Sequence, residues 1–220
     1  IGPVGPTGSA GSDSTIGIRA ESCQSGYFVT GFNSNGTVIC SGGDSTDCAL
    51  IGPGMNLQGC DLRGEDLEDA NLRNANLDQT DLSRTVLNGA DLSGASLRFA
   101  NLRRANLIAA DLGEADLTGA DLTDAGLLKA DLRDAVMREA TFTAATLYQA
   151  DMDGVDLSFS DLTLADLREV DLDHAVLRFV DFTDADLKDA SFTGSVLGGV
   201  IWNNTVCPSG ANSTVSGNTC

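Results

Sequence analysis

The amino-acid sequence predicts an all-β solenoid, a rod in which the chain turns a corner after every five residues. Two observations predict it. An apolar side chain recurs at every fifth position over the middle two-thirds of the 220 residues, and the residue two positions earlier is small. Self-similarity at a fixed period is typical of repeat architectures. Because aromatic residues make up only 5% of the chain, we expect a core of Leu and Ala.

The repeat starts at Leu57 and continues without a break to Leu197. All 29 of these positions hold Leu, Met or Phe, and Trp202 continues the frame. In an α-helix, positions five residues apart advance by about 140° and wind around all sides. In a straight strand they alternate between the two faces. Only a chain that bends at each repeat buries them together. The positions that are not Leu are Met137, Phe142, Met152, Phe182 and Phe192.

A second inward position lies two residues before each of these apolar residues. It holds Ala in every repeat from Ala95 to Ala150. Glu65 breaks the rule, because a charged side chain stands where a small one belongs. A buried unpaired charge is costly, so we expect a loose first coil in which the carboxylate reaches water or Arg63. A functional site near this end is the alternative.

The motif A-(D/N)-L-x-x over residues 56–202 resembles that of the pentapeptide-repeat family. The resemblance implies a right-handed quadrilateral β-helix, in which four successive repeats form the four sides of one coil. At an inter-strand spacing of roughly 4.8 Å, the repeats make about seven coils and a rod on the order of 35 Å long. The end coils of a solenoid expose strand edges and core unless they are capped. We expect small disulfide-bounded caps at both ends, with Trp202 as the C-terminal lid.

Shorter segments flank the repeat. Residues 1–19 begin with an Ile followed by G-P-V-G-P-T-G-S-A-G, which resembles the end of a collagen-like repeat; a flexible Gly/Pro linker is the alternative. Residues 20–55 contain two strand-like runs around Asn35-Gly36, a strong hairpin turn signal, followed by a Gly-rich connection. Residues 203–220 are expected to form a C-terminal cap loop.

Six cysteines lie outside the acidic repeat or at its edge. No C-x-x-C pair exists and the chain has one His, so disulfides are expected rather than a zinc site. Disulfides indicate an extracellular or cell-surface location; six reduced thiols are the alternative. The rod separates the last two cysteines from the other four by tens of ångströms. We therefore expect the nearest-neighbour pairs Cys23–Cys40, Cys48–Cys60 and Cys207–Cys220.

The charge distribution excludes several classes of function. Net charge is −19, and 28 of the 32 acidic side chains lie within residues 56–202. A phosphate-bearing partner needs a basic face, so we expect neither nucleic acid nor an anionic membrane as a partner. The sequence contains no run of about 18 apolar residues, so we expect no membrane-spanning helix. The chain starts at Ile1 without Met or a signal peptide, and we expect a processed form or a fragment.

Nothing in the sequence predicts catalysis. The single histidine, His174, lies at an outward position, and no Ser has a base partner. No Gly-rich phosphate-binding loop follows a strand. Paired carboxylates occur throughout the repeat, so a pair of carboxylates here does not indicate a catalytic acid and base. We expect no enzyme, no cofactor, and no catalytic or metal-binding residues.

In a coil of four repeats, every fourth repeat stacks on the same side of the rod. An Asp column of this kind is expected to bond local backbone, as Asp does in turns; a weak divalent-ion column is the alternative. A Thr column is typical of a pleated surface, with an ice-binding ladder as the alternative. The two columns are Asp91, Asp111, Asp131, Asp151 and Asp171, and Thr123, Thr143, Thr163 and Thr183.

A further side carries Phe99, Phe159 and Phe179. Arg98 and Arg178 directly precede two of these rings, and aromatic residues together with Arg are enriched in interface cores. We expect a contact surface here, formed with another rod or with a parent fibre. Scattered surface Phe that needs no explanation is the alternative. The same side holds Val136, Val176 and Val196 where other sides mostly have Asp or Asn.

Two functions are compatible with these features. The first is a secreted or surface-displayed structural rod, at the tip of a collagen-like fibre or as a subunit of an assembling filament. Its expected partners are proteins, including further copies of itself. The second follows from the resemblance, because some members of the family mimic DNA in width and negative charge and bind DNA gyrase. The uncharged, cysteine-closed tail favours the first function.

Overall fold

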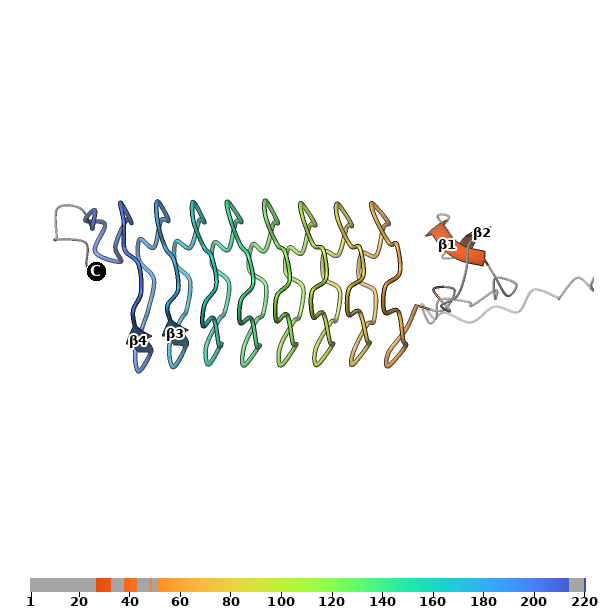
Figure 1. Ribbon diagram of the computed structural model, residues 1–220, viewed down its shortest axis with the longest axis horizontal. Coiled ribbons are helices and arrows are strands. Elements are labelled where there is room, and N and C mark those ends of the chain that lie inside the picture. The colour runs from red at the N-terminus through yellow and green to blue at the C-terminus, as the bar shows by residue number, and fades with distance from the viewer. Residues whose placement is uncertain (1–26, 33–37, 43–47, 49–50, 214–219) are drawn as a thin grey trace, which may run out of the picture.

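The middle of the chain forms one four-sided rod of stacked coils (Figure 1). Parallel bridges join each outward position to the equivalent position four repeats later, from Asn56↔Asn76 to Asp186↔Val206. One coil therefore consists of four repeats, and the ladder comprises seven complete coils, which confirms the predicted coil length and number. The computed structural model describes residues 27–32, 38–42, 48, 51–213 and 220.

Two strands precede the rod. β1 (Tyr27–Phe32) pairs antiparallel with β2 (Val38–Gly42), with a register shift between Val29 and Gly31. The pairing is that of the predicted hairpin. The turn residues 33–37 lie outside the described residues, and so do Cys23 and the collagen-like segment 1–19. The Cys23–Cys40 pair therefore stays a prediction.

A tight turn after each inward apolar residue produces the corners. The carbonyl of Leu127 accepts a hydrogen bond from the amide of Ala130 at 3.1 Å. The residue just before that Ala, Lys129, has a φ of 57°, in the left-handed region. Each side is therefore too short for a long strand, and most sides contribute one bridge to the ladder. Within the described part of the rod, only β3 (Val176–Arg178) and β4 (Val196–Gly198), which pair in parallel, form longer strands.

The core is the predicted ladder of apolar residues. Every position of the frame from Leu57 to Leu187 is at most 3% exposed, and the small positions from Ala95 to Ala150 are buried as well. Where a hydroxyl replaces Ala, it bonds to the backbone of the preceding coil, as a buried polar group must. Thr80 Oγ1 donates to the Leu57 carbonyl at 2.8 Å, and Ser160 Oγ donates to the Met137 carbonyl at 2.6 Å.

Glu65 is half-buried in the first coil. Burial disfavours its charged form and raises the pKa of its carboxyl, and the neighbouring Asp61 carboxylate adds to this rise. Arg63 does not pair with Glu65; it pairs with Asp61 (Nη2–Oδ2 2.6 Å) and lies near Asp81. The carboxylate is thus accommodated by partial exposure, with a raised affinity for a proton.

Disulfides close both ends of the rod. Cys48 and Cys60 are bonded, with Cα atoms 5.8 Å apart, and both are almost fully buried. Cys207 and Cys220 are bonded, with Cα atoms 5.3 Å apart. Two of the three expected pairs are therefore confirmed.

The C-terminal end departs from the sequence prediction. The repeat assigns Leu197 to the core, but Leu197 is 53% exposed because no described coil lies beyond it. Trp202 is partly buried and stacks on Phe182 with ring centroids 5.1 Å apart. Among the described residues that follow, the Thr205 amide donates to Ser213 Oγ at 2.8 Å. Trp202 therefore packs on Phe182 as a lid would, but Leu197 of the same end stays exposed.

The residue with positive φ in each turn leans over its equivalent on the next coil. The ring of Phe179 packs against Gly199, where a Cβ would come within 2.6 Å of a ring carbon. The same ring stacks on that of Phe159, with centroids 5.1 Å apart and planes 13° apart. The ring of Phe99 lies on Gly119 as Phe179 lies on Gly199. An aromatic side chain at this turn position is thus followed on the next coil by Gly or by a ring that stacks on it.

Leu127→Asp should unfold the rod or cost at least ~4 kcal/mol, because it places an unpaired charge among fully buried side chains. Lys129→Asp, at an exposed position of the following turn, should change the free energy of unfolding by less than ~0.5 kcal/mol. Thermal and denaturant melts measure both. Equal losses in the two variants would show that the inward and outward assignments are wrong.

Gly199→Ala should cost about 1 kcal/mol more than Gly64→Ala, the approximate value of an aromatic stack. Both glycines have positive φ (68° and 69°), but a Cβ on Gly64 meets no atom within 4 Å. The control therefore carries the backbone strain without the ring contact. Denaturant melts give the difference, and loss of contacts between Phe159 and Phe179 in NMR spectra reports the displaced ring. Indistinguishable stabilities with an intact stack would contradict the packing of Phe179 on Gly199.

Candidate interaction surface

The aromatic side is defined as the side formed by residues 96–100 and by the equivalent segments of the later coils up to 196–200. Phe99, Phe159 and Phe179 occupy the turn position with positive φ on this side, with φ between 56° and 66°. Their exposed fractions are 57%, 60% and 57%. A non-glycine residue with positive φ is uncommon. The turn therefore holds three rings outward in a conformation that a Phe residue seldom adopts.

The structure brings two of the three rings together. Phe159 and Phe179 are on successive coils and stack. Phe99 is three coils away, and the intervening positions of its column hold Gly119 and Glu139. The predicted set is therefore an aromatic pair near the C-terminal end and a separate ring three coils before Phe159. The aromatic pair, Phe159 with Phe179, is the larger apolar contact.

The two arginines of the predicted surface differ. The guanidinium of Arg98 lies 3.7 Å from Asp116 Oδ2. Arg178 is exposed, and within the described part of the chain its guanidinium forms no ion pair. Its aliphatic stem lies beside Gly198, where a Cβ would come within 3.7 Å of its Cγ. A cation next to the aromatic pair is thus left available to an outside group.

Valines extend the apolar area toward the end of the rod. Val176 and Val196 face each other across β3 and β4, and Val196 is 43% exposed. Val136 is 36% exposed, but the following coil places Asp156 beside it, held by Arg138 at 2.6 Å. The continuous apolar part of the aromatic side is therefore confined to its last coils.

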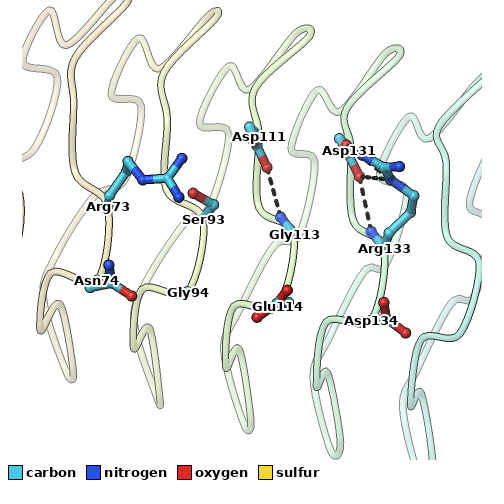
Figure 2. Close-up of a pocket in the computed structure, with 10 residues that line it drawn as sticks. All are labelled: Arg73, Asn74, Ser93, Gly94, Asp111, Gly113, Glu114, Asp131, Arg133 and Asp134. Carbon is cyan, nitrogen blue, oxygen red and sulfur yellow. Dashed lines mark hydrogen bonds and ion pairs between the residues drawn. The ribbon is translucent and has the colours of Figure 1, made fainter.

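The acidic side consists of residues 91–95 and the equivalent segments of the later coils up to 171–175. Its Asp column bonds local backbone, as predicted: Asp111 Oδ1 accepts the Gly113 amide at 3.0 Å, and Asp131 Oδ1 accepts the Arg133 amide at 3.1 Å (Figure 2). These turns account for an acid at the same position of each coil.

A shallow groove of about 350 Å³ runs across the acidic side, and Arg73 and Arg133 lie along it (Figure 2). The hydrogen bonds that Arg133 donates to Asp131, with Nε 2.9 Å from Oδ1, lower the pKa of that carboxyl. Asp131 therefore stays charged to a lower pH than a free aspartate. Among the described residues, no group of three His, Cys, Asp or Glu side chains is placed to hold a metal ion.

The threonine column uses part of its hydrogen-bonding capacity internally. Thr123 Oγ1 donates to Asp121 Oδ1 at 2.6 Å, and Thr143 Oγ1 donates to Asp161 Oδ2 at 3.1 Å. The hydroxyls of these two residues thus serve the neighbouring turns.

His174 lies at an outward turn position, as expected, and contacts an acid that sequence reasoning did not assign to it. Its Nδ1 is 2.8 Å from Asp153 Oδ1. This hydrogen bond raises the pKa of His174. The two residues are 21 positions apart, one more than a full coil of 20 residues. The coil length together with the direction in which the turn side chain leans was therefore the signal for the pair. The ring also lies over Gly194, as Phe179 lies over Gly199.

No part of the described chain is a helix of the length and apolarity needed to cross a membrane. The shape of the described site is that of an exposed side of a rod rather than an enclosed cleft. What it offers chemically is an apolar, aromatic contact area beside an arginine, on a molecule that is otherwise acidic.

Comparison with known proteins agrees with this architecture. The family model for pentapeptide repeats matches residues 54–89, 85–124, 100–138, 127–158 and 160–199. The crystal structure of HetL, a pentapeptide repeat protein involved in heterocyst differentiation regulation in the cyanobacterium Nostoc, has a TM-score of 0.54 and 30% identity. The match covers 71% of this chain and 78% of HetL.

A second solved structure is QnrB1, described as a plasmid-mediated fluoroquinolone resistance protein. It has a TM-score of 0.51 and 21% identity, with 67% of this chain and 70% of that chain covered. This likeness shows the fold alone. A search of curated proteins finds no match. The matched repeats span well over half of the sequence, so the chain belongs to the pentapeptide-repeat family.

Proposed function

We propose that this protein is a secreted or surface-displayed structural rod, whose partner contacts the last coils of the aromatic side. The observation that carries the proposal is the aromatic pair. Phe159 and Phe179 stack on each other, yet each leaves more than half of its surface in water. A soluble rod gains nothing from holding two rings outward in this way unless something covers them.

The surroundings of the pair suit a protein partner. Val176 and Val196 extend the apolar area, and Arg178 supplies at its edge a cation without an ion-pair partner among the described residues. Interface cores are enriched in aromatic residues and Arg and depleted of acids. Burying the exposed parts of two Phe rings is worth a few kcal/mol at roughly 25 cal/mol per Å². We expect the partner to be another copy of the rod or the parent fibre.

The disulfides support an extracytoplasmic location. Disulfides form and persist in oxidising compartments and are rare where glutathione keeps thiols reduced. Cys48–Cys60 and Cys207–Cys220 sit at the two ends of the rod, where a solenoid most needs protection against fraying. In this proposal the collagen-like residues 1–19 are the end of a stalk that displays the rod.

Replacing both rings, Phe159→Ser with Phe179→Ser, should abolish assembly or adhesion and leave the fold intact. The matched control is Leu164→Ser, which removes an apolar side chain of similar exposure (58%) from the same turn position on another side. Light scattering and a surface-adhesion assay measure the outcome, with circular dichroism as the check on folding. Unchanged mass and unchanged adhesion in the double variant would remove the aromatic side from the proposal.

A DNA-mimicking inhibitor of a DNA-binding protein such as gyrase is the second candidate. The acidic charge of the repeat favours it. However, carboxylates of the Asp column such as Asp111 and Asp131 already bond the backbone of their own turns, which accounts for the column without a mimicry role. A gyrase supercoiling assay separates the candidates, because only the inhibitor reduces supercoiling.

A further inference from the structure

A groove of about 650 Å³ crosses the first three coils of the rod, on the side formed by residues 61–65, 81–85 and 101–105. We call it the arginine groove, because half of the residues that line it are arginines: Arg63, Arg84, Arg103 and Arg104. Among the residues that the structure describes, Asp81 is the only acid that lines it. The chain as a whole carries −19, so the groove is a local reversal of charge.

The coil length brings these arginines together. Arg63 and Arg103 occupy the same turn position two coils apart, and Arg84 and Arg104 occupy the next position on adjacent coils. Successive coils are roughly 4.8 Å apart, so the four arginines come from a stretch of this side about 10 Å long. One small ligand can therefore contact more than one guanidinium group.

Much of the hydrogen-bonding capacity of these arginines is unused. Arg84 is exposed, and within the described part of the chain its guanidinium forms neither an ion pair nor a hydrogen bond. Arg103 uses Nη1, which lies 3.0 Å from Asp121 Oδ2. Arg104 uses Nε, which lies 3.3 Å from Asp124 Oδ2. A guanidinium has five N–H donors, so all three arginines keep donors for an outside acceptor.

The acid of the groove, Asp81, is bonded within the protein. Its Oδ1 accepts hydrogen bonds from the Ser83 amide and from Asn101 Nδ2, both at 3.0 Å. Its Oδ2 lies 3.6 Å from Arg63 Nε. This carboxylate therefore serves its own turn and the neighbouring coils, and it leaves Arg84 available to an outside anion.

The rest of this side limits the length of a ligand. The equivalent segments of the later coils, from 121–125 to 201–205, hold no Lys or Arg and five acids: Asp121, Asp124, Asp161, Asp181 and Asp184. Like charges that face each other across an interface are destabilising. A long polyanion, such as a nucleic acid, would meet these carboxylates if it followed the rod. The arginine groove therefore suits an anion that ends within the first three coils.

We propose that the arginine groove binds a small anion carrying phosphate or sulfate groups, held by Arg84 together with Arg103 and Arg104. Guanidinium groups donate pairs of parallel hydrogen bonds to such oxyanions in a fixed geometry. A phosphate group offers three acceptor oxygens, so that more than one arginine can share it. The volume of the groove is in the range of small-molecule sites. The site lies on a different side from the aromatic side and does not depend on the proposed function.

Isothermal titration calorimetry at low ionic strength, where charges are least screened, should show saturable binding of inorganic pyrophosphate or sulfate. Arg84→Gln should raise the dissociation constant at least ~10-fold, because it removes a charged hydrogen-bond donor from the site. The variant should stay folded in thermal melts, since Arg84 is exposed. Arg138→Gln is the matched control: it removes the same charge from an exposed arginine on the aromatic side and should bind as the wild type does.

NMR spectra locate the bound probe. Pyrophosphate should shift the backbone amides of Ser83, Arg84 and Arg104 and leave that of Thr183, on the same side of a later coil, unchanged. Tighter binding of pyrophosphate would identify a phosphate-bearing ligand, and tighter binding of sulfate a sulfate-bearing one.

The proposal would be overturned if neither probe binds saturably, or if Arg84→Gln binds as tightly as Arg138→Gln. Tighter binding of a DNA duplex longer than the rod than of either probe would overturn it as well, because the groove would then serve a long polyanion.

Discussion

The hydrogen bond from each coil to the next is the interaction on which the rest of this rod depends. The Leu127 amide reaches the Thr146 carbonyl at 2.7 Å, and the Asp131 amide reaches the Ala110 carbonyl at 2.9 Å. These bonds fix the coil at four repeats, and a fixed coil length places each side chain above its equivalent on the previous coil. Leu side chains then stack in the core and Asp side chains stack in the turns. The outward turn position does not pack in the core, so its side chain can vary from coil to coil.

Inward positions therefore determine the stability of the rod, and outward positions are available for its function. The inward frame and the small positions are alike along the rod, so that stability is approximately a sum over neighbouring coils. Outward positions vary, and their variation is concentrated near one end: the aromatic pair, β3 with β4, and the uncharged last coil. The acidic charge elsewhere repels other acidic molecules. In the proposed function, contacts therefore form at the places that lack it.

Spacing along the chain was enough to predict the buried frame. The resemblance to the pentapeptide-repeat family supplied the coil of four repeats, and the columns and two of the disulfides followed from the two together. The exposure of Leu197 did not follow, because burial at the last coil depends on a layer beyond it rather than on the local motif. The stacking of Phe179 on Gly199 and the His174–Asp153 pair were missed as well. Both depend on the direction in which a turn side chain leans, which spacing does not specify.

Amide hydrogen exchange along the rod tests the coil-to-coil ladder most directly. The account predicts a five-residue pattern, with strong protection at frame residues such as Leu127. Amides that directly follow a frame residue, such as that of Arg133, which bonds a side-chain carboxylate on the surface, should exchange faster. Uniform protection, or a pattern without the five-residue period, would contradict a rod built from inter-coil hydrogen bonds.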